Sequence, residues 1–144
     1  MSRKPTLAGA MTPFPHSVDI KAPLDEAQEF LREHRIRHLP VTDEGVLVGV
    51  VTDRDIKLLL GPDFAYPEPQ TLSVSDAMVE DAYVVDLRTP LATVLEHMAS
   101  KRLGSALVTR KGKLAGVFTT TDACRAFASL LAPDQGDPGE DDAA

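Results

Sequence analysis

The chain contains the stretch Gly49-Val50-Val51-Thr52-Asp53-Arg54-Asp55 and repeats it as Gly116-Val117-Phe118-Thr119-Thr120-Thr121-Asp122. The copies are 67 residues apart (116 minus 49), and this spacing holds without a gap over the preceding sequence. From Pro23 to Asp55 the first copy is identical to the second at 12 of 33 positions, whereas unrelated segments of ordinary composition would share roughly two. The sequence is therefore an internal repeat, and both copies must place a Thr and an Asp at the same point of one fold.

Each copy shows the same succession of local patterns. A short alternating run, 17–20 or 83–87, predicts a half-buried strand, and apolar residues at helical spacing follow Pro23 and Pro90, which suit the first turn of a helix. Two apolar strands come next, joined by a short link that ends in Gly and predicts a hairpin. A second helix is expected directly after Thr52 and Thr119. The predicted unit is β-α-β-β-α, which gives a mixed α/β (α+β) fold class.

The length of 144 residues favours one domain, because two units of about 60 residues would each be marginally stable alone. We expect repeat one at about 7–60, a linker at about 61–71 and repeat two at about 72–132, so that residues 1–132 form the repeat pair. Residues 133–144 form an acidic tail that is expected to be disordered. The tail carries five of the acidic residues behind the net charge of −7, which leaves the body near −2.

Composition excludes several classes of protein. No apolar run approaches the ~20 residues that span a bilayer, and the N-terminus lacks a secretory signal pattern, which predicts a cytoplasmic protein with no membrane association. The lone Cys124 cannot form an intrachain disulfide. The chain has neither a Gly-x-Ser-x-Gly elbow nor a phosphate-binding Lys loop, so we do not expect an enzyme with catalytic residues.

Two further site types are disfavoured. His34 and His38 are four residues apart, as metal ligands on one helix face would be, but the predicted boundary between helix and strand falls between them. No metal site is expected. The clustered bases near His38 could suggest nucleic acid, but the acidic composition and the few aromatic residues, 5% of the chain, argue against it.

The repeated Thr and Asp allow two interpretations. In each copy the Thr ends an apolar strand and the Asp follows three residues later at the start of a helix, which is the arrangement of a helix cap. A helix N-terminus with free N–H groups also binds anions, and a nearby carboxylate can accept hydrogen bonds from a sugar diol. The same residues therefore fit either a purely structural cap or a nucleotide-sized site.

On this repeat, element order and motif, the chain resembles a tandem pair of cystathionine β-synthase (CBS) domains, often called a Bateman module. The resemblance covers about residues 7–131. The motif is Gly, a hydrophobic residue, any residue, Thr or Ser, two free positions and Asp, and both copies match it in full. The string Ile36-Arg37-His38-Leu39-Pro40-Val41 is a further family-like feature. The resemblance implies two repeats packed through their sheets about a pseudo-twofold axis, with two clefts that hold adenosine compounds.

The resemblance also implies the roles of individual residues. Asp55 and Asp122 would accept from the ribose hydroxyls, while Thr52 and Thr119 would bond the sugar or phosphate. Because family clefts mix the repeats, Asp122 and Thr119 would face Val18 and Ile36, and Asp55 and Thr52 would face Val85 and Leu103. These four apolar residues either sandwich the adenine or belong to the core.

The copies differ in the bases that would meet phosphate. Copy one has Arg35, Arg37, His38, Arg54 and Lys57, where copy two has Arg102, Gly104, Ser105, Thr121 and Cys124. Arg37 and His38 stand where related clefts contact phosphate, and charge-assisted bonds from Arg suit that role. A solvated strand edge is the alternative for these bases, Arg54 included. The asymmetry predicts that nucleotide occupies one cleft better than the other.

These observations predict a stand-alone regulatory module that binds an adenine nucleotide (AMP, ADP or ATP) or S-adenosylmethionine and signals to an effector protein still to be identified. No obligatory cofactor is expected. A homodimer is expected from the resemblance, with the apolar helix at 123–131 as its surface. The rival hypothesis is a ligand-free scaffold for dimerisation or protein interaction, in which Thr and Asp only cap helices.

Overall fold

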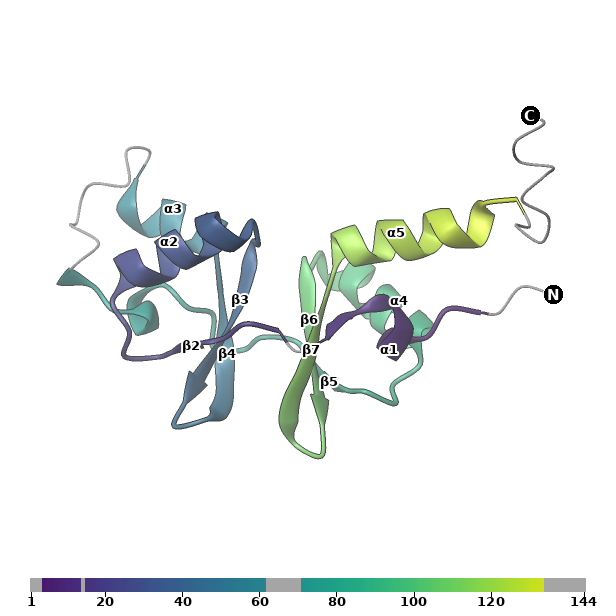
Figure 1. Ribbon diagram of the computed structural model, residues 1–144, viewed down its shortest axis with the longest axis horizontal. Coiled ribbons are helices and arrows are strands. Elements are labelled where there is room, and N and C mark those ends of the chain that lie inside the picture. The colour runs from purple at the N-terminus through teal and green to yellow at the C-terminus, as the bar shows by residue number, and fades with distance from the viewer. Residues whose placement is uncertain (1–3, 14, 62–70, 134–144) are drawn as a thin grey trace.

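The computed structural model describes residues 4–13, 15–61 and 71–133. The predicted tail, apart from Pro133, and most of the predicted linker lie outside these residues. The described part forms two sheets with helices on their outer sides (Figure 1). This arrangement confirms the mixed fold class and the two packed repeats that were predicted.

The first sheet has the strand order β2-β3-β4. Its elements are β2 (Val18–Asp19), α2 (Leu24–His34), β3 (His38–Asp43), β4 (Val46–Thr52) and α3 (Asp53–Leu60). Strand β2 pairs with β3 in parallel, and β3 pairs with β4 antiparallel. Helix α2 forms because Leu24, Ala27 and Leu31 fall on one face and are buried in the first core.

The second sheet repeats this order and gains one strand, with the order β1-β7-β6-β5. Its elements are α1 (Leu7–Ala10), β1 (Thr12–Pro13), β5 (Val84–Asp86), α4 (Leu91–Lys101), β6 (Ser105–Arg110), β7 (Lys113–Thr119) and α5 (Thr120–Leu131). Helix α4 buries Leu91, Val94 and Met98 in the second core. Pro23 and Pro90 precede α2 and α4 as N-cap residues, one position earlier than predicted.

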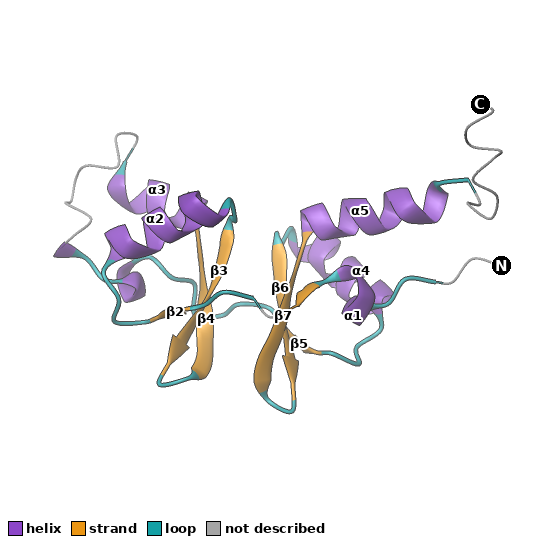
Figure 2. Ribbon diagram, in the orientation of Figure 1, coloured by secondary structure: helices purple, strands orange, loops and turns teal. Residues whose placement is uncertain are grey.

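The repeat extends to backbone detail. Both hairpins turn through two residues with positive φ, Glu44 and Gly45 in one half and Lys111 and Gly112 in the other, as the twist of a tight hairpin requires. The register shifts between Val41 and Thr42, and again 67 residues later between Val108 and Thr109. The two hairpin turns point to the same end of the molecule (Figure 2).

The segment that opens each repeat in sequence packs on the other half in space. Strand β1 pairs with β7, and Leu7 of α1 is buried beside Phe118, so α1 lies among α4 and α5 (Figure 1). Conversely, η2 (Val74–Asp76) places Val74 in the first core. The backbone N–H of Val74 donates to the carbonyl oxygen of Ala22 at 2.9 Å. The two halves therefore exchange their entry segments.

A third apolar cluster joins the sheets. Val50 of β4 packs with Leu107 of β6 and Val117 of β7, all of which are nearly excluded from solvent. Burial of these residues fixes the halves against each other, so the ends of β4 and β7 come close to the opposite repeat. In the part of the chain that the structure describes, every helix is too short or too polar to cross a membrane.

Candidate ligand-binding clefts

Both repeated Thr and Asp pairs form capping boxes. Thr52 ends β4, its hydroxyl accepts from the Asp55 N–H at 3.1 Å, and Asp55 Oδ2 accepts from the Thr52 N–H at 3.1 Å and from its hydroxyl at 2.7 Å. Thr119 and Asp122 make the same three bonds at 2.9 to 3.2 Å. The caps explain locally why α3 and α5 begin where they do. In both copies they use one carboxylate oxygen, Oδ2, and leave Oδ1 outside the cap.

The first cleft, called here the Asp122 cleft, has a volume of about 610 Å³. It lies between the end of β7, the start of α5 and residues of the first repeat. Its lining includes Thr12, Ile36, Arg37, His38, Thr119, Asp122 and Arg125. The fold thus brings together Thr119, Asp122 and Ile36, which the resemblance put in one cleft.

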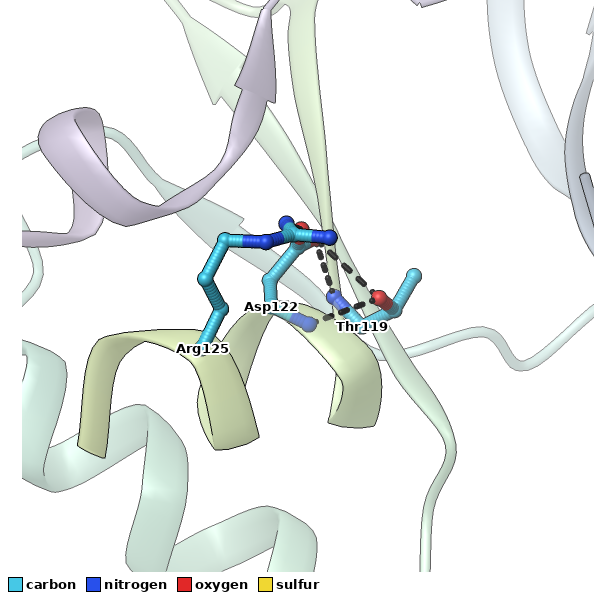
Figure 3. Close-up of polar contacts among 3 residues, drawn as sticks. All are labelled: Thr119, Asp122 and Arg125. Atoms are coloured by element: carbon cyan, nitrogen blue, oxygen red, sulfur yellow. Dashed lines mark hydrogen bonds and ion pairs between the residues drawn. The ribbon is translucent and has the colours of Figure 1, made fainter. Parts of the chain in front are cut away.

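Asp122 is nearly buried, with 5% of its surface exposed. Its Oδ1 accepts from Arg125 Nη1 at 3.1 Å, one turn further along α5 (Figure 3). The Arg125 side chain is 72% exposed. Copy one has Leu58 at the position of Arg125, and the described part of the chain offers Asp55 Oδ1 no partner. The two carboxylates are therefore in different electrostatic surroundings.

The second cleft, called here the central basic cleft, has a volume of about 1030 Å³. It extends between the start of α3, the end of α4 and the start of α5. Its charged lining residues are Arg37, His38, Asp53, Arg54, Lys57 and Arg102. Asp53 forms an ion pair with Lys57 at 3.2 Å, so the remaining positive charge of the cleft comes from the arginines. A cleft with this surplus of arginine favours anions with several oxygens.

Thr52 and Leu103, which the resemblance put together, both line the central basic cleft. Val18 and Val85 are placed differently. Val18 packs against the first core, and Val85, 8% exposed, belongs to the second. Among the residues that the structure describes, the linings of these two clefts do not include Val18, Val85 or Asp55.

His38 lies between the two clefts and lines both of them, as does Arg37. Its ring is next to Gly104, where an added Cβ would lie 3.0 Å from Nε2, so the glycine at that position makes room for the imidazole. Burial lowers the pKa of His38, and the neighbouring Arg37 lowers it further. Asp55 and Asp122 act on this pKa in the opposite direction, which shows that His38 is within electrostatic reach of both carboxylates.

Sequence reasoning did not single out Arg125. The available signal was its position, three residues after Asp122 and hence on the same helix face, together with the change to Leu58 in the other copy. Neither His34 nor His38 is placed for a shared metal ion. The His34 ring packs against His16 and Phe30, with ring centroids 4.3 Å apart in each case, while His38 faces Gly104.

The same two repeats are recognised by comparison with known proteins. The family model "CBS domain" matches residues 7–61 and again residues 74–129, which is most of the chain. The chain belongs to the CBS domain family. It is 35% identical over 99 residues to the protein YlbB of Bacillus subtilis (strain 168), a match that covers 67% of this chain and 65% of YlbB.

Two solved structures illustrate the fold. The structure of CBSX2 in complex with AMP superimposes with a TM-score of 0.75 at 29% identity and covers 88% of this CBS pair and 98% of CBSX2. The CBS domain pair of MJ0100 in complex with 5'-methylthioadenosine and S-adenosyl-L-methionine has a TM-score of 0.77 at 22% identity, covering 89% and 99%. At that identity the second likeness concerns the fold alone.

Proposed function

We propose that this CBS pair is a regulatory, non-catalytic module that binds an adenine nucleotide between its repeats and signals to a partner protein. The observation that carries the proposal is the Asp122 cleft. It joins a nearly buried carboxylate and a strand-end hydroxyl of repeat two to the apolar Ile36 and the bases Arg37 and His38 of repeat one. These are the chemical groups that a ribose, an adenine and a phosphate require. CBSX2, a similar CBS protein, binds AMP.

In the Asp122 cleft, we assign the ribose diol to Asp122 and the sugar or phosphate oxygens to the Thr119 hydroxyl. Ile36 contacts the adenine face, and Arg37 and His38 bind the phosphate. Asp122 can serve both cap and ligand, because the cap uses Oδ2 and a diol needs an acceptor such as Oδ1. Val18, like Ile36, packs against the first core, but it does not line this cleft.

The central basic cleft is the second proposed subsite. Thr52 and Leu103, which line this cleft, take the roles of Thr119 and Ile36. Asp55 lies outside the lining and holds Thr52 through the capping box, and Val85 belongs to the second core. Arg54 adds a cation at the mouth of this cleft. The positive lining favours AMP, ADP or ATP over S-adenosylmethionine, whose sulfonium is cationic, so the adenine nucleotides are the leading ligand class.

Signalling requires a protein surface that responds when the nucleotide binds and the packing of the repeats changes. The first assembly that we propose for this role is a homodimer. Helix α5 leaves Phe127, Leu130 and Leu131 exposed, at 61%, 46% and 67%. Such apolar side chains on one helix commonly mark a protein contact. The exposed free thiol of Cys124 suits a reducing compartment, so we place the module in the cytoplasm.

The same helix face favours a second candidate function, a ligand-free scaffold. In that case the capping boxes would be the whole purpose of the repeated Thr and Asp, and the exposed face of α5 would be the functional surface.

Calorimetric titration of the full chain with AMP, ATP and S-adenosylmethionine separates the two functions. The variants are Asp122→Ala and Asp55→Ala. Asp76→Ala is the matched control, because Asp76 makes the same kind of capping box with Ser73, with Oδ2 2.8 Å from the Ser73 N–H. The described lining of both clefts excludes Asp76.

We expect the wild-type protein and Asp76→Ala to bind a nucleotide equally, and Asp122→Ala to bind it at least tenfold more weakly, since a charged hydrogen-bond acceptor for the ribose is lost. A folded wild-type protein that binds none of the three compounds would refute nucleotide sensing and favour the scaffold. An equal loss of affinity in all three variants would mean that the substitutions act through helix capping and not through contacts with the ligand.

A further inference from the structure

The two oxygens of the Asp122 carboxylate have separate partners. Oδ2 is held by the Thr119 N–H and hydroxyl, and Oδ1 by Arg125 Nη1 at 3.1 Å (Figure 3). The backbone bond at Oδ2 belongs to the helix cap and cannot be given up without exposing the end of α5. Oδ1 is the oxygen left outside the cap, so a ribose diol that binds Asp122 approaches the oxygen that Arg125 holds and competes with it there.

We infer that Arg125 is the residue that selects phosphate-bearing ligands in the Asp122 cleft, by exchanging Asp122 for the ligand's phosphate. This inference rests on the proposed function. In the structure the guanidinium neutralises the nearly buried carboxylate. When the ribose hydroxyls take the Oδ1 position, the guanidinium leaves it and pairs with the phosphate of the same ligand.

The geometry allows this exchange. Arg125 is 72% exposed, so its side chain is not fixed by packing and can change rotamer at low cost. It lines the same cleft as Arg37 and His38, the proposed phosphate ligands. Arg125 also borders a second groove between α1 and α5, which offers room for the side chain to turn.

The exchange affects nucleotides and nucleosides differently. With AMP, Arg125 loses one anionic partner and gains another, so the free energy of its ion pair nearly cancels. With adenosine, the Arg125–Asp122 pair is broken and no phosphate replaces it. Arg125 thus lowers the affinity of the cleft for uncharged nucleosides, and a phosphate group on the ligand removes this loss. The repeat supplies the natural comparison, because copy one has Leu58 at this position.

The test is calorimetric titration of the full chain with AMP and with adenosine, for the wild-type protein and Arg125→Leu, the copy-one residue. We expect adenosine to bind about three- to fivefold more tightly to Arg125→Leu, the range set by an ion pair whose guanidinium is exposed. AMP affinity should stay within about twofold, so the preference for AMP falls. Arg125→Ala provides the same measurement should the added leucine promote association through the apolar face of α5.

Arg88→Leu is the control, because Arg88 also pairs with an aspartate, Asp86, at 3.0 Å and is 92% exposed. It should leave both affinities unchanged. An adenosine affinity that does not rise in either Arg125 variant, or that rises no more than the AMP affinity, overturns the inference while wild-type binding of AMP upholds the proposed function. A wild-type protein that binds neither compound refutes the proposed function and this inference together.

Discussion

Gly49 is the first residue of the repeated motif, and its role can be tested by replacing it with alanine. A Cβ at this position would collide with the backbone carbonyl of Val79. The neighbouring Val50 exchanges two backbone hydrogen bonds with Val79, one at 3.1 Å and one at 2.8 Å. A backbone carbonyl cannot move aside as a side chain can, so the Val79 segment must shift away from β4.

The expected loss of stability follows from these contacts. Two backbone hydrogen bonds contribute about 2 kcal/mol, and forcing the segments apart adds about 1 kcal/mol. Replacement of Gly by Ala also reduces the conformational freedom of the unfolded chain, which stabilises the folded protein by about 0.5 to 1 kcal/mol. We therefore expect Gly49→Ala to lower the free energy of unfolding by about 2 to 3 kcal/mol.

Urea unfolding followed by circular dichroism measures this change, since the chain has no Trp for fluorescence. Gly45→Ala is the control. Gly45 has φ +83 with no described heavy atom within 4 Å of the added Cβ, so it tests backbone strain alone, at about 1 kcal/mol. A Gly49→Ala protein no less stable than Gly45→Ala, with unchanged amide protection at Val50 and Val79, would refute the argument.

Two other predictions concern pH and assembly. Burial and Arg37 lower the pKa of His38 below 6.5, so the unfolded chain takes up this proton at a higher pH than the folded protein. Stability contributed by neutral His38 is therefore complete above about pH 6.5 and is lost as the pH falls from there toward the folded pKa. Urea midpoints at pH 7.5 and 5.5 should differ more in the wild-type protein than in His38→Asn, and equal differences would contradict this assignment. Leu131→Asp should convert a dimer to a monomer in sedimentation equilibrium, because it puts a charge into the apolar face of α5. A wild-type monomer at the same concentration would exclude that interface.

Most of the fold could be predicted from the sequence, because the features that decide it are local. The stripe Leu24, Ala27 and Leu31 gives α2, and the links ending in Gly45 and Gly112 give the hairpins with their positive φ values. The capping boxes also follow from a Thr and an Asp three residues apart. The repeat doubles each of these signals, so an interpretation of one copy can be checked on the other.

The parts that depend on distant contacts could not be predicted. Alternation at Val18 and Val85 indicates that each strand has a buried face, but it does not say whether a ligand or the core covers that face. The structure gives these residues to the two cores. His38 comes near Asp55 within repeat one, because β3 pairs with β4 and places His38 opposite Thr52. Its proximity to Asp122 arises where the two halves meet, and a spacing within one repeat contains no information on that meeting point.

The exchange of entry segments bears on how such a chain folds and how it arose. Leu7 completes the core of the second half and Val74 that of the first, so neither core can close before segments far apart in sequence have met. Folding should be slow for a chain of this size, with a single cooperative transition for both repeats. In a one-repeat ancestor, the first segment would have completed the core of a second copy of the chain. Duplication would then have turned a swapped dimer into one polypeptide.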